Sequence, residues 1–314
     1  ASPGESGLNG ETAQVVTVDN FANYLSAQEG AGPFIIKLSG ELLAGRIPEI
    51  KAALNTDKAK IVSLDLSEVT GLTNIPNDAF DSVTNLQAIA LPNTVTVIGE
   101  EAFYYCSKLK TVKLQNNLTT IGYSAFKECS VLENINIPET VTNIKDYAFY
   151  GCRTITNIQL SQGLLLIGNY AFIGCKGLTS IIIPGSVISI GNYAFGGSSG
   201  GSCTSLSQVI INDGVKIIGN SAFYGCTSIS SIEIPDSVTS MGTYVFEGCT
   251  NLSSVKFPNI STALNTGMFS GCSSLSSITI PSNVTNIGES ALYGCTSLTK
   301  LVIPDTVTSI GASA

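Results

Sequence analysis

The sequence predicts a solenoid, in which short repeated units stack on one another to form an elongated rod. The segments at 222–242 and 291–311 are nearly identical, AFYGCTSISSIEIPDSVTSMG and ALYGCTSLTKLVIPDTVTSIG. A unit of this length cannot bury an apolar face alone, so stacked neighbours must share one core. One position recurs every 23 residues, apart from a single step of 28, and marks ten tandem units: Phe80, Phe103, Phe126, Phe149, Phe172, Phe195, Phe223, Phe246, Phe269 and Leu292.

Each unit is expected to contain a short strand, a turn and a second apolar pair. In the seventh unit Ile232 and Ile234 flank Glu233, which is the alternation of a strand with one buried face. Proline follows this strand in seven units and ends it, because proline has no N–H to donate to a ladder. The next pair, Val238 and Met241, precedes a glycine that recurs in eight units, where we expect a positive φ. The short segment around each Phe is predicted to form one helical turn or a 3₁₀ piece, with Ala and Phe pointing inward.

The repeated pattern AFxxCxxLxxIxIPxxVTxIGxxAF over residues 77–311 resembles that of the BspA-like leucine-rich repeats, found on bacterial surface proteins and in some protists. The resemblance implies a leucine-rich-repeat solenoid, α/β by convention, with mostly short parallel strands joined by turns or 3₁₀ pieces. Its expected shape is a right-handed curved rod with an N-terminal α/β cap. The resemblance also implies adhesion, since relatives are associated with binding extracellular-matrix proteins and with coaggregation.

Three regions follow from this pattern. We predict a disordered tail at 1–16, a cap with two irregular repeats at 17–76, and the ten 23-residue repeats at 77–314, with a glycine-serine insertion at 196–202. The cap region resembles that of related proteins from gut and oral bacteria. It would shield the first edge of the sheet, an edge that otherwise invites aggregation.

The cap itself is expected to contain two helices and two strands. Helices are predicted at 17–29, with Asp19 as the N-cap, and at 46–54. Two irregular strands would extend the sheet of the repeats, each burying a pair of apolar side chains: Ile36 with Leu38, and Leu64 with Leu66.

Composition excludes several classes of function. The formal net charge of −8 argues against nucleic-acid binding, which needs a basic stripe. No apolar run of 18 residues could span a bilayer. The chain has no histidine, so Ser-His-Asp catalysis, Cys-His catalysis and imidazole zinc sites are excluded, and no cofactor is expected. Only 12% of residues are charged, and reliance on Ser, Thr and Asn for solubility favours an extracellular or cell-surface protein.

All nine cysteines occupy one position of the repeat. They could form a metal ladder, a disulfide framework or a buried stack of free thiols. Side chains in a ladder run parallel, whereas a disulfide needs converging Cβ vectors and zinc needs four ligands around a point. Val83 fills the same position in the first unit, which favours buried, structural thiols. The nine are Cys106, Cys129, Cys152, Cys175, Cys203, Cys226, Cys249, Cys272 and Cys295.

The outward positions of the strands vary between units, so they are where a repeat protein can recognise a partner. The residue between the two buried strand positions is mostly polar, but it is Ile182 and Ile210 in two adjacent units. Exposed apolar clusters tend to mark interfaces. The alternative is that these side chains pack against each other. Similar apolar residues follow the turn in the central units and complete a candidate ligand patch: Leu165, Leu166, Ile188 and Ile217.

Ten of the eleven tyrosines lie in the segments around the Phe column and are expected to form a row opposite the long strands. Aromatic rings with a polar tip favour interfaces and can stack on sugars. The alternative is that they only shield the turns. The candidate row is Tyr123, Tyr147, Tyr150, Tyr170, Tyr193, Tyr224 and Tyr244.

Together these features predict a non-enzymatic, exported surface protein that uses its extended repeat face to bind a protein on a host or neighbouring cell. No pair of carboxylates flanks a cleft, as a glycosidase would need. A carbohydrate-binding module and a structural spacer that presents another domain are the alternatives, and the expected ligand is an extracellular protein or glycan. The sequence stops at IGASA, so we expect edge-to-edge self-association or a continuation to protect Leu301 and Ile303.

Overall fold

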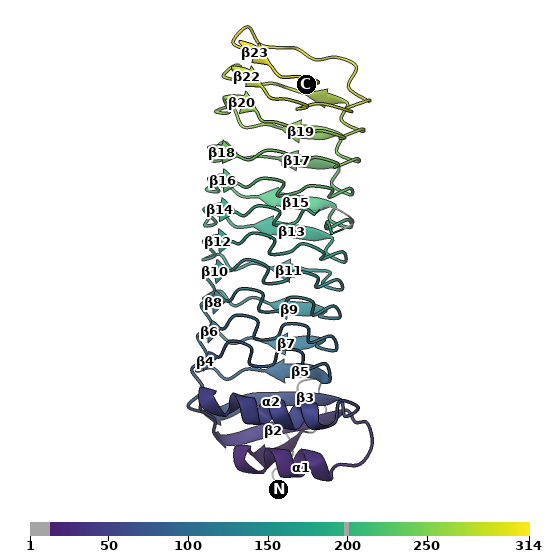
Figure 1. Cartoon of the computed structure of the whole chain (residues 1–314). Coiled ribbons are helices and arrows are strands. Elements are labelled where there is room, and N and C mark those ends of the chain that lie inside the picture. Colours follow the sequence, from purple (N-terminus) through teal and green to yellow (C-terminus); the bar gives the residue numbers. More distant parts are fainter. Residues whose placement is uncertain (1–12, 198–200) are drawn as a thin grey trace.

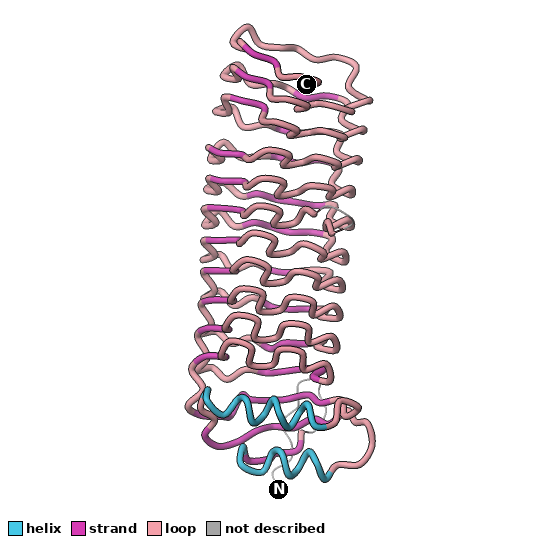
Figure 2. The backbone as a smooth tube through the Cα atoms, viewed as in Figure 1, coloured by secondary structure: helices cyan, strands magenta, loops and turns pink. Residues whose placement is uncertain are grey.

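A computed structural model describes residues 13–197 and 201–314 of the chain. It confirms the solenoid: the units stack into an elongated column, and the helices lie at its N-terminal end (Figure 1). Figure 2 shows that the repeats consist of short strands joined by turns and loops. Two ladders of parallel strands run along the column.

The N-terminal cap contains both helices and the longest strands. Strand β1 pairs in parallel with β2, and β2 pairs with β3. Its elements are β1 (Gln14–Thr17), η1 (Val18–Asn20), α1 (Phe21–Ala27), β2 (Phe34–Glu41), η2 (Ala44–Arg46), α2 (Ile47–Thr56) and β3 (Val62–Thr70). The predicted pairs Ile36 with Leu38 and Leu64 with Leu66 are fully buried in β2 and β3.

Two expectations for the cap are wrong. Residues 14–16 were assigned to the tail but belong to β1, and the rest of the described part of that segment, residue 13, precedes the strand. Asp19 is not an N-cap, because it lies within η1, and Asn20 precedes α1 without a capping side-chain hydrogen bond. The Asp19 carboxylate instead accepts a 2.8 Å hydrogen bond from the Arg46 guanidinium, which ties η1 to the start of α2.

The first ladder continues the cap strands into the repeats. The strands follow one another as β1-β2-β3-β5-β7-β9-β11, then β13-β15, then β17-β19-β21. Its repeat strands are β5 (Leu86–Ala90), β7 (Thr111–Lys113), β9 (Asn134–Asn136), β11 (Ile158–Gln159), β13 (Ser180–Ile183), β15 (Gln208–Ile211), β17 (Ser231–Glu233), β19 (Ser254–Lys256) and β21 (Ser277–Ile278). These strands contain the alternating positions recognised in the sequence.

The second ladder consists of two-residue strands along another side of the column (Figure 1). One sheet contains β4 (Asn74–Ile75), β6 (Val97–Ile98), β8 (Thr120–Ile121), β10 (Asn143–Ile144), β12 (Leu166–Ile167), β14 (Ser189–Ile190), β16 (Ile217–Ile218) and β18 (Ser240–Met241). A separate sheet contains β20 (Ala263–Leu264), β22 (Asn286–Ile287) and β23 (Ser309–Ile310). The ladder is therefore interrupted between β18 and β20.

The core between the ladders is a column of phenylalanine rings. Consecutive rings from Phe80 to Phe269 stack with centroids 5.2–5.6 Å apart and planes within 8° of parallel. Every one of these Phe side chains is fully buried. Like residues therefore meet like residues from one unit to the next, as the 23-residue period predicts.

The segments around the Phe residues are non-helical turns, so the expectation of a helical turn or a 3₁₀ piece was wrong. Cys175 N donates to Phe172 O at 3.1 Å within a turn, while Phe172 N donates to Ala194 O in the next unit at 2.8 Å. Tyr170 has φ +58° and Gly174 has φ +77°, and both values lie outside any right-handed helix. Most units therefore pass through the left-handed region on both sides of their Phe, and the unit of Phe195 does so at Tyr193 but not at Gly197.

The glycine that follows the second ladder is explained by close approach and not by a positive φ. Positive φ values in the repeats fall on other positions, such as Tyr170 and Gly174. A Cβ added to Gly168 would lie 2.5 Å from the backbone N of Asp146 in the preceding unit. The expectation of a positive φ was wrong because residue type alone does not separate these two requirements.

Candidate ligand-binding surfaces

The cysteine column belongs to the interior. Eight of the nine free cysteines are fully buried, and Cys295 is partly buried. Each Sγ donates to the carbonyl of a Phe in the column, as Cys129 does to Phe103 O at 3.0 Å. Burial raises the pKa of the Cys106 thiol to about 12, so the thiol stays protonated at neutral pH. Among residues 13–197 and 201–314, no group of three or more His, Cys, Asp or Glu could hold a metal ion.

The central part of the tyrosine row forms a stack of its own. The rings of Tyr147 and Tyr170 lie 4.7 Å apart and within 11° of parallel, and those of Tyr170 and Tyr193 lie 5.2 Å apart and within 4°. Tyr123 meets Tyr147 edge-on at 5.5 Å, and Tyr150 meets it tilted at 6.0 Å. Because the rings face each other, the inner faces of this stack are not available to a sugar ring.

A lysine caps one end of the tyrosine stack. Lys127 Nζ lies 5.2 Å from the ring centroid of Tyr147, 5.3 Å from that of Tyr150 and 5.6 Å from that of Tyr104. A cation at this distance is attracted to the ring face. Tyr244 shares the column of Tyr193, but Ser221 occupies the unit between them, and Tyr224 occupies the column of Tyr150. The predicted row is thus a continuous stack in the units of Tyr123 to Tyr193, followed by separate rings.

The six residues of the candidate patch lie on two different ladders. Ile182 on β13 and Ile210 on β15 are direct register partners in the first ladder. Their side chains are 53% and 39% exposed, although their column is otherwise mostly polar. The remaining four lie on or beside β12, β14 and β16 of the second ladder: Leu165, Leu166, Ile188 and Ile217. Of these, only Leu166 is half-buried.

A cleft adjoins the Ile182 side of the first ladder. It has a volume of about 330 Å³ and lies between β11 and β13, where only an isolated bridge joins Asn157 to Ser180. Polar side chains of Asn157, Gln159 and Gln162 line it, together with Ile182. Sequence periodicity did not indicate this cleft. One available signal was Ser161, which replaces the proline that ends the strand in most units.

The insertion at 196–202 falls partly outside the described residues, which omit 198–200. Its last residue is folded against the following unit: Ser202 Oγ is buried, donates to Gly197 O at 2.6 Å and lies 2.8 Å from Tyr224 O. The 28-residue unit therefore keeps its place in the column, and the Phe195 and Phe223 rings on either side still stack at 5.3 Å.

Two exposed charges of the first ladder pair with each other. Glu233 and Lys256, register partners on β17 and β19, form an ion pair. Both side chains are more than half exposed, so this pair contributes little to stability. None of the helices in the described part of the chain is long and apolar enough to cross a membrane.

The repeats are similar to a known family of bacterial leucine-rich repeats and to solved structures of leucine-rich repeat proteins. A family model described as BspA type leucine rich repeat region (6 copies) matches residues 73–200 and 201–314. A leucine-rich repeat protein from Bacteroides ovatus is 28% identical, with a TM-score of 0.61 over 81% of this chain and 76% of that chain. A leucine rich cell surface protein from Faecalibacterium prausnitzii is also 28% identical, with a TM-score of 0.42 over 77% of this chain and 83% of that one. No curated protein matches this chain.

Proposed function

Because the chain belongs to the BspA-type leucine-rich-repeat family, we propose that it is an exported, non-enzymatic surface protein that binds another protein through its central repeats. The family supports the general role of a repeat scaffold for protein binding. The proposal adds two points. The binding site is the first-ladder surface around β13 and β15, and the partner is an extracellular protein of a host or a neighbouring cell.

The exposed pair Ile182 and Ile210 carries this proposal. The two side chains are adjacent across paired strands, and Ile182 also borders the 330 Å³ cleft lined by amide side chains. An apolar centre surrounded by polar groups is the usual anatomy of a protein–protein interface. About half of each isoleucine is already buried, so covering the remainder is worth about 1 kcal/mol each. Losing both anchors should weaken binding roughly 30-fold.

The tyrosine stack offers less support for a glycan-binding function. Stacking on sugars requires an open ring face, and the faces of Tyr147, Tyr170 and Tyr193 are turned toward one another. Protein binding at the isoleucine pair therefore ranks above carbohydrate binding at the tyrosines.

The test is binding of the purified protein to a panel of immobilised extracellular-matrix proteins, measured by surface plasmon resonance. The variant Ile182→Thr/Ile210→Thr introduces the residue that the same column has at Thr279. The matched control is Ile188→Thr/Ile217→Ser, which removes two equally exposed isoleucines from the second ladder. We expect the first variant to bind roughly 30-fold more weakly and the control to bind like the unmodified protein. Equal binding by both variants, or no binding by the unmodified protein, would contradict the proposal.

A further inference from the structure

One rung is missing from the hydrogen-bond ladder that follows the second set of strands. In the units on either side, Thr239 N donates to Lys216 O at 3.0 Å and Thr285 N donates to Thr262 O at 2.9 Å. The equivalent bond from Thr262 N to Thr239 O is absent from the described part of the chain, and β20 does not pair with β18. The N–H of Thr262 and the C=O of Thr239 therefore do not form the backbone hydrogen bond that this position has in the neighbouring units.

The eighth unit explains the interruption. It reads PNISTALN at 258–265, where the seventh unit reads PDSVTSMG at 235–242. Ser261 replaces the inward valine, and Asn265 replaces the glycine. Asn265 Nδ2 donates to Met241 O at 2.6 Å. In other units this carbonyl accepts from the backbone N–H of the residue at the Asn265 position, as Leu264 O does from Gly288 N.

The asparagine amide, and not merely an added Cβ, accounts for the change. Lys145 stands at the same repeat position in another unit, and its N–H still donates to Ile121 O at 3.0 Å. Strands β8 and β10 remain paired there. A side chain at this position is therefore compatible with a closed ladder unless it takes the acceptor itself.

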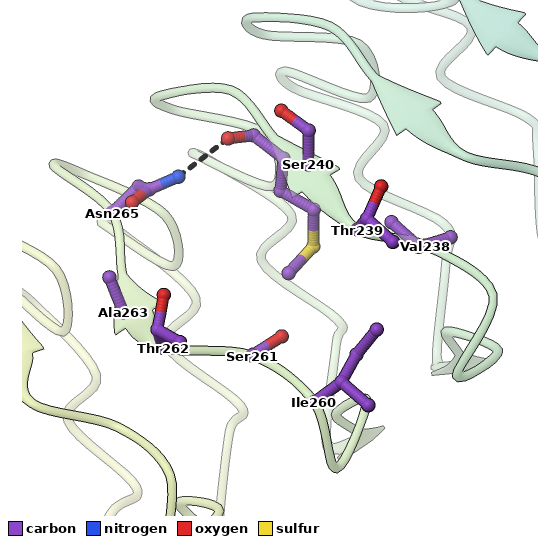
Figure 3. Close-up of a pocket in the computed structure, with 9 residues that line it drawn as sticks. Val238, Thr239, Ser240, Ile260, Ser261, Thr262, Ala263 and Asn265 are labelled. Carbon is purple, nitrogen blue, oxygen red and sulfur yellow. Dashed lines mark hydrogen bonds between the residues drawn. The ribbon is translucent and has the colours of Figure 1, made fainter.

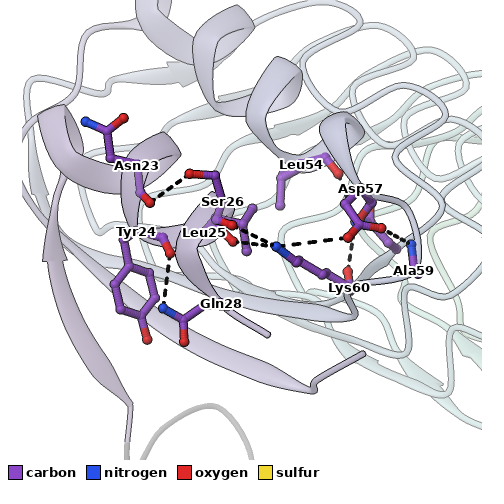
Figure 4. Close-up of polar contacts among 10 residues, drawn as sticks. Asn23, Tyr24, Leu25, Ser26, Gln28, Leu54, Asp57, Ala59 and Lys60 are labelled. Carbon is purple, nitrogen blue, oxygen red and sulfur yellow. Dashed lines mark hydrogen bonds and ion pairs between the residues drawn. The ribbon is translucent and has the colours of Figure 1, made fainter. Parts of the chain in front are cut away.

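The interruption opens a cleft of about 350 Å³ between the seventh and eighth units (Figure 3). Met241 and Ile260 supply apolar walls, and no ionisable side chain lines the cleft. The polar lining comes from both sides of the gap and consists of Thr239, Ser240, Ser261, Thr262 and Asn265. Its volume is in the range of small-molecule sites, roughly 300–1,000 Å³.

We propose that this cleft binds a neutral sugar that carries an acetamido group, either as a free monosaccharide or at the end of a glycan. A secondary amide has one N–H and one C=O on opposite edges, which complement Thr239 O and Thr262 N. The methyl group matches the apolar walls, and the sugar hydroxyls match the Ser and Thr hydroxyls. This site is separate from the protein-binding surface around Ile182, and neither proposal depends on the other.

The experiment is a titration of the purified protein with N-acetylglucosamine, N-acetylgalactosamine and their parent sugars glucose and galactose, followed by calorimetry and ligand-observed NMR. We expect at least one acetamido sugar to bind about 10-fold or more tightly than its parent, because the parent leaves both backbone groups unmatched. A glycan array then distinguishes the two sources. If the ligand is the end of a glycan, the protein should bind array spots that display terminal acetamido sugars; if the ligand is the free monosaccharide, it should not.

The variant Ile260→Ser/Ser261→Val/Asn265→Gly, called here the consensus variant, introduces the residues of the seventh unit at three positions and should close the cleft. It is expected to lose sugar binding while its melting temperature rises, a combination that misfolding cannot produce. The control Ile188→Thr, elsewhere on the same ladder, should bind like the unmodified protein. Three outcomes would overturn the proposal: no acetamido preference, binding retained by the consensus variant, or equally tight binding of an N-acetyl dipeptide amide.

Discussion

Removal of one phenylalanine ring from the middle of the column tests whether the stacked interior holds the fold together. Phe172 is fully buried, and its ring stacks on Phe149 at 5.4 Å and on Phe195 at 5.2 Å. A Phe→Ala substitution in a core costs about 3–5 kcal/mol through lost transfer energy and the cavity left behind. Phe172→Ala also removes two stacked ring contacts, so we expect its loss of unfolding free energy to lie near the upper end of this range, at about 4–5 kcal/mol.

Phe172→Leu is the matched control, because the last unit has Leu292 in the same column. A swap between apolar residues of similar volume costs less than about 1.5 kcal/mol. Urea unfolding followed by circular dichroism measures both free energies of unfolding. We expect Ala to destabilise by about 3 kcal/mol more than Leu. A difference below about 1 kcal/mol would refute the claim that the column is a continuous, tightly packed core.

Three further predictions concern the thiols and the tyrosine stack. With a thiol reagent at pH 7.5, the native protein should react slowly and first at Cys295, and all nine cysteines should react in denaturant; rapid reaction of several native thiols would contradict this. Burial raises the pKa of Cys203 and Cys249 from 9.0 to about 12, so the folded chain holds protons that the unfolded chain releases. The stability from these thiols is therefore complete below about pH 9 and lost as the pH rises toward 12, and urea unfolding that shows no decline between pH 8.5 and 10.5 would argue against it. Lys127→Met should lower the free energy of unfolding by about 1 kcal/mol through lost cation–π contacts, whereas Lys108→Met, away from the stack, should change it by less than about 0.5 kcal/mol.

The repeat period made the interior predictable from the sequence. Once Phe80 and its successors were aligned, the buried columns and the first-ladder strands followed, because identical positions in stacked units meet identical neighbours. The cap helices were also located, since their apolar spacing is local. Strand β1 was missed because a four-residue edge strand at 14–17 has little periodicity of its own.

Features that depend on backbone geometry could be predicted less well from the sequence. The sequence identified the repeated glycine, but only the structure shows that Gly168 is needed for close approach. Ile182 and Ile188 looked like parts of one patch, yet a turn places them on different ladders. The interruption at Asn265 is visible in the sequence as a departure from the pattern, but its consequence depends on which acceptor the amide side chain takes.

Hydrogen–deuterium exchange with and without a bound matrix protein tests the central claim, that the outward residues of the central first-ladder strands make the binding surface. The account predicts slower exchange at 180–183 and 208–211 in the complex and unchanged exchange at 165–167 and 188–190. Protection confined to the second ladder, or spread evenly along all the repeats, would contradict it.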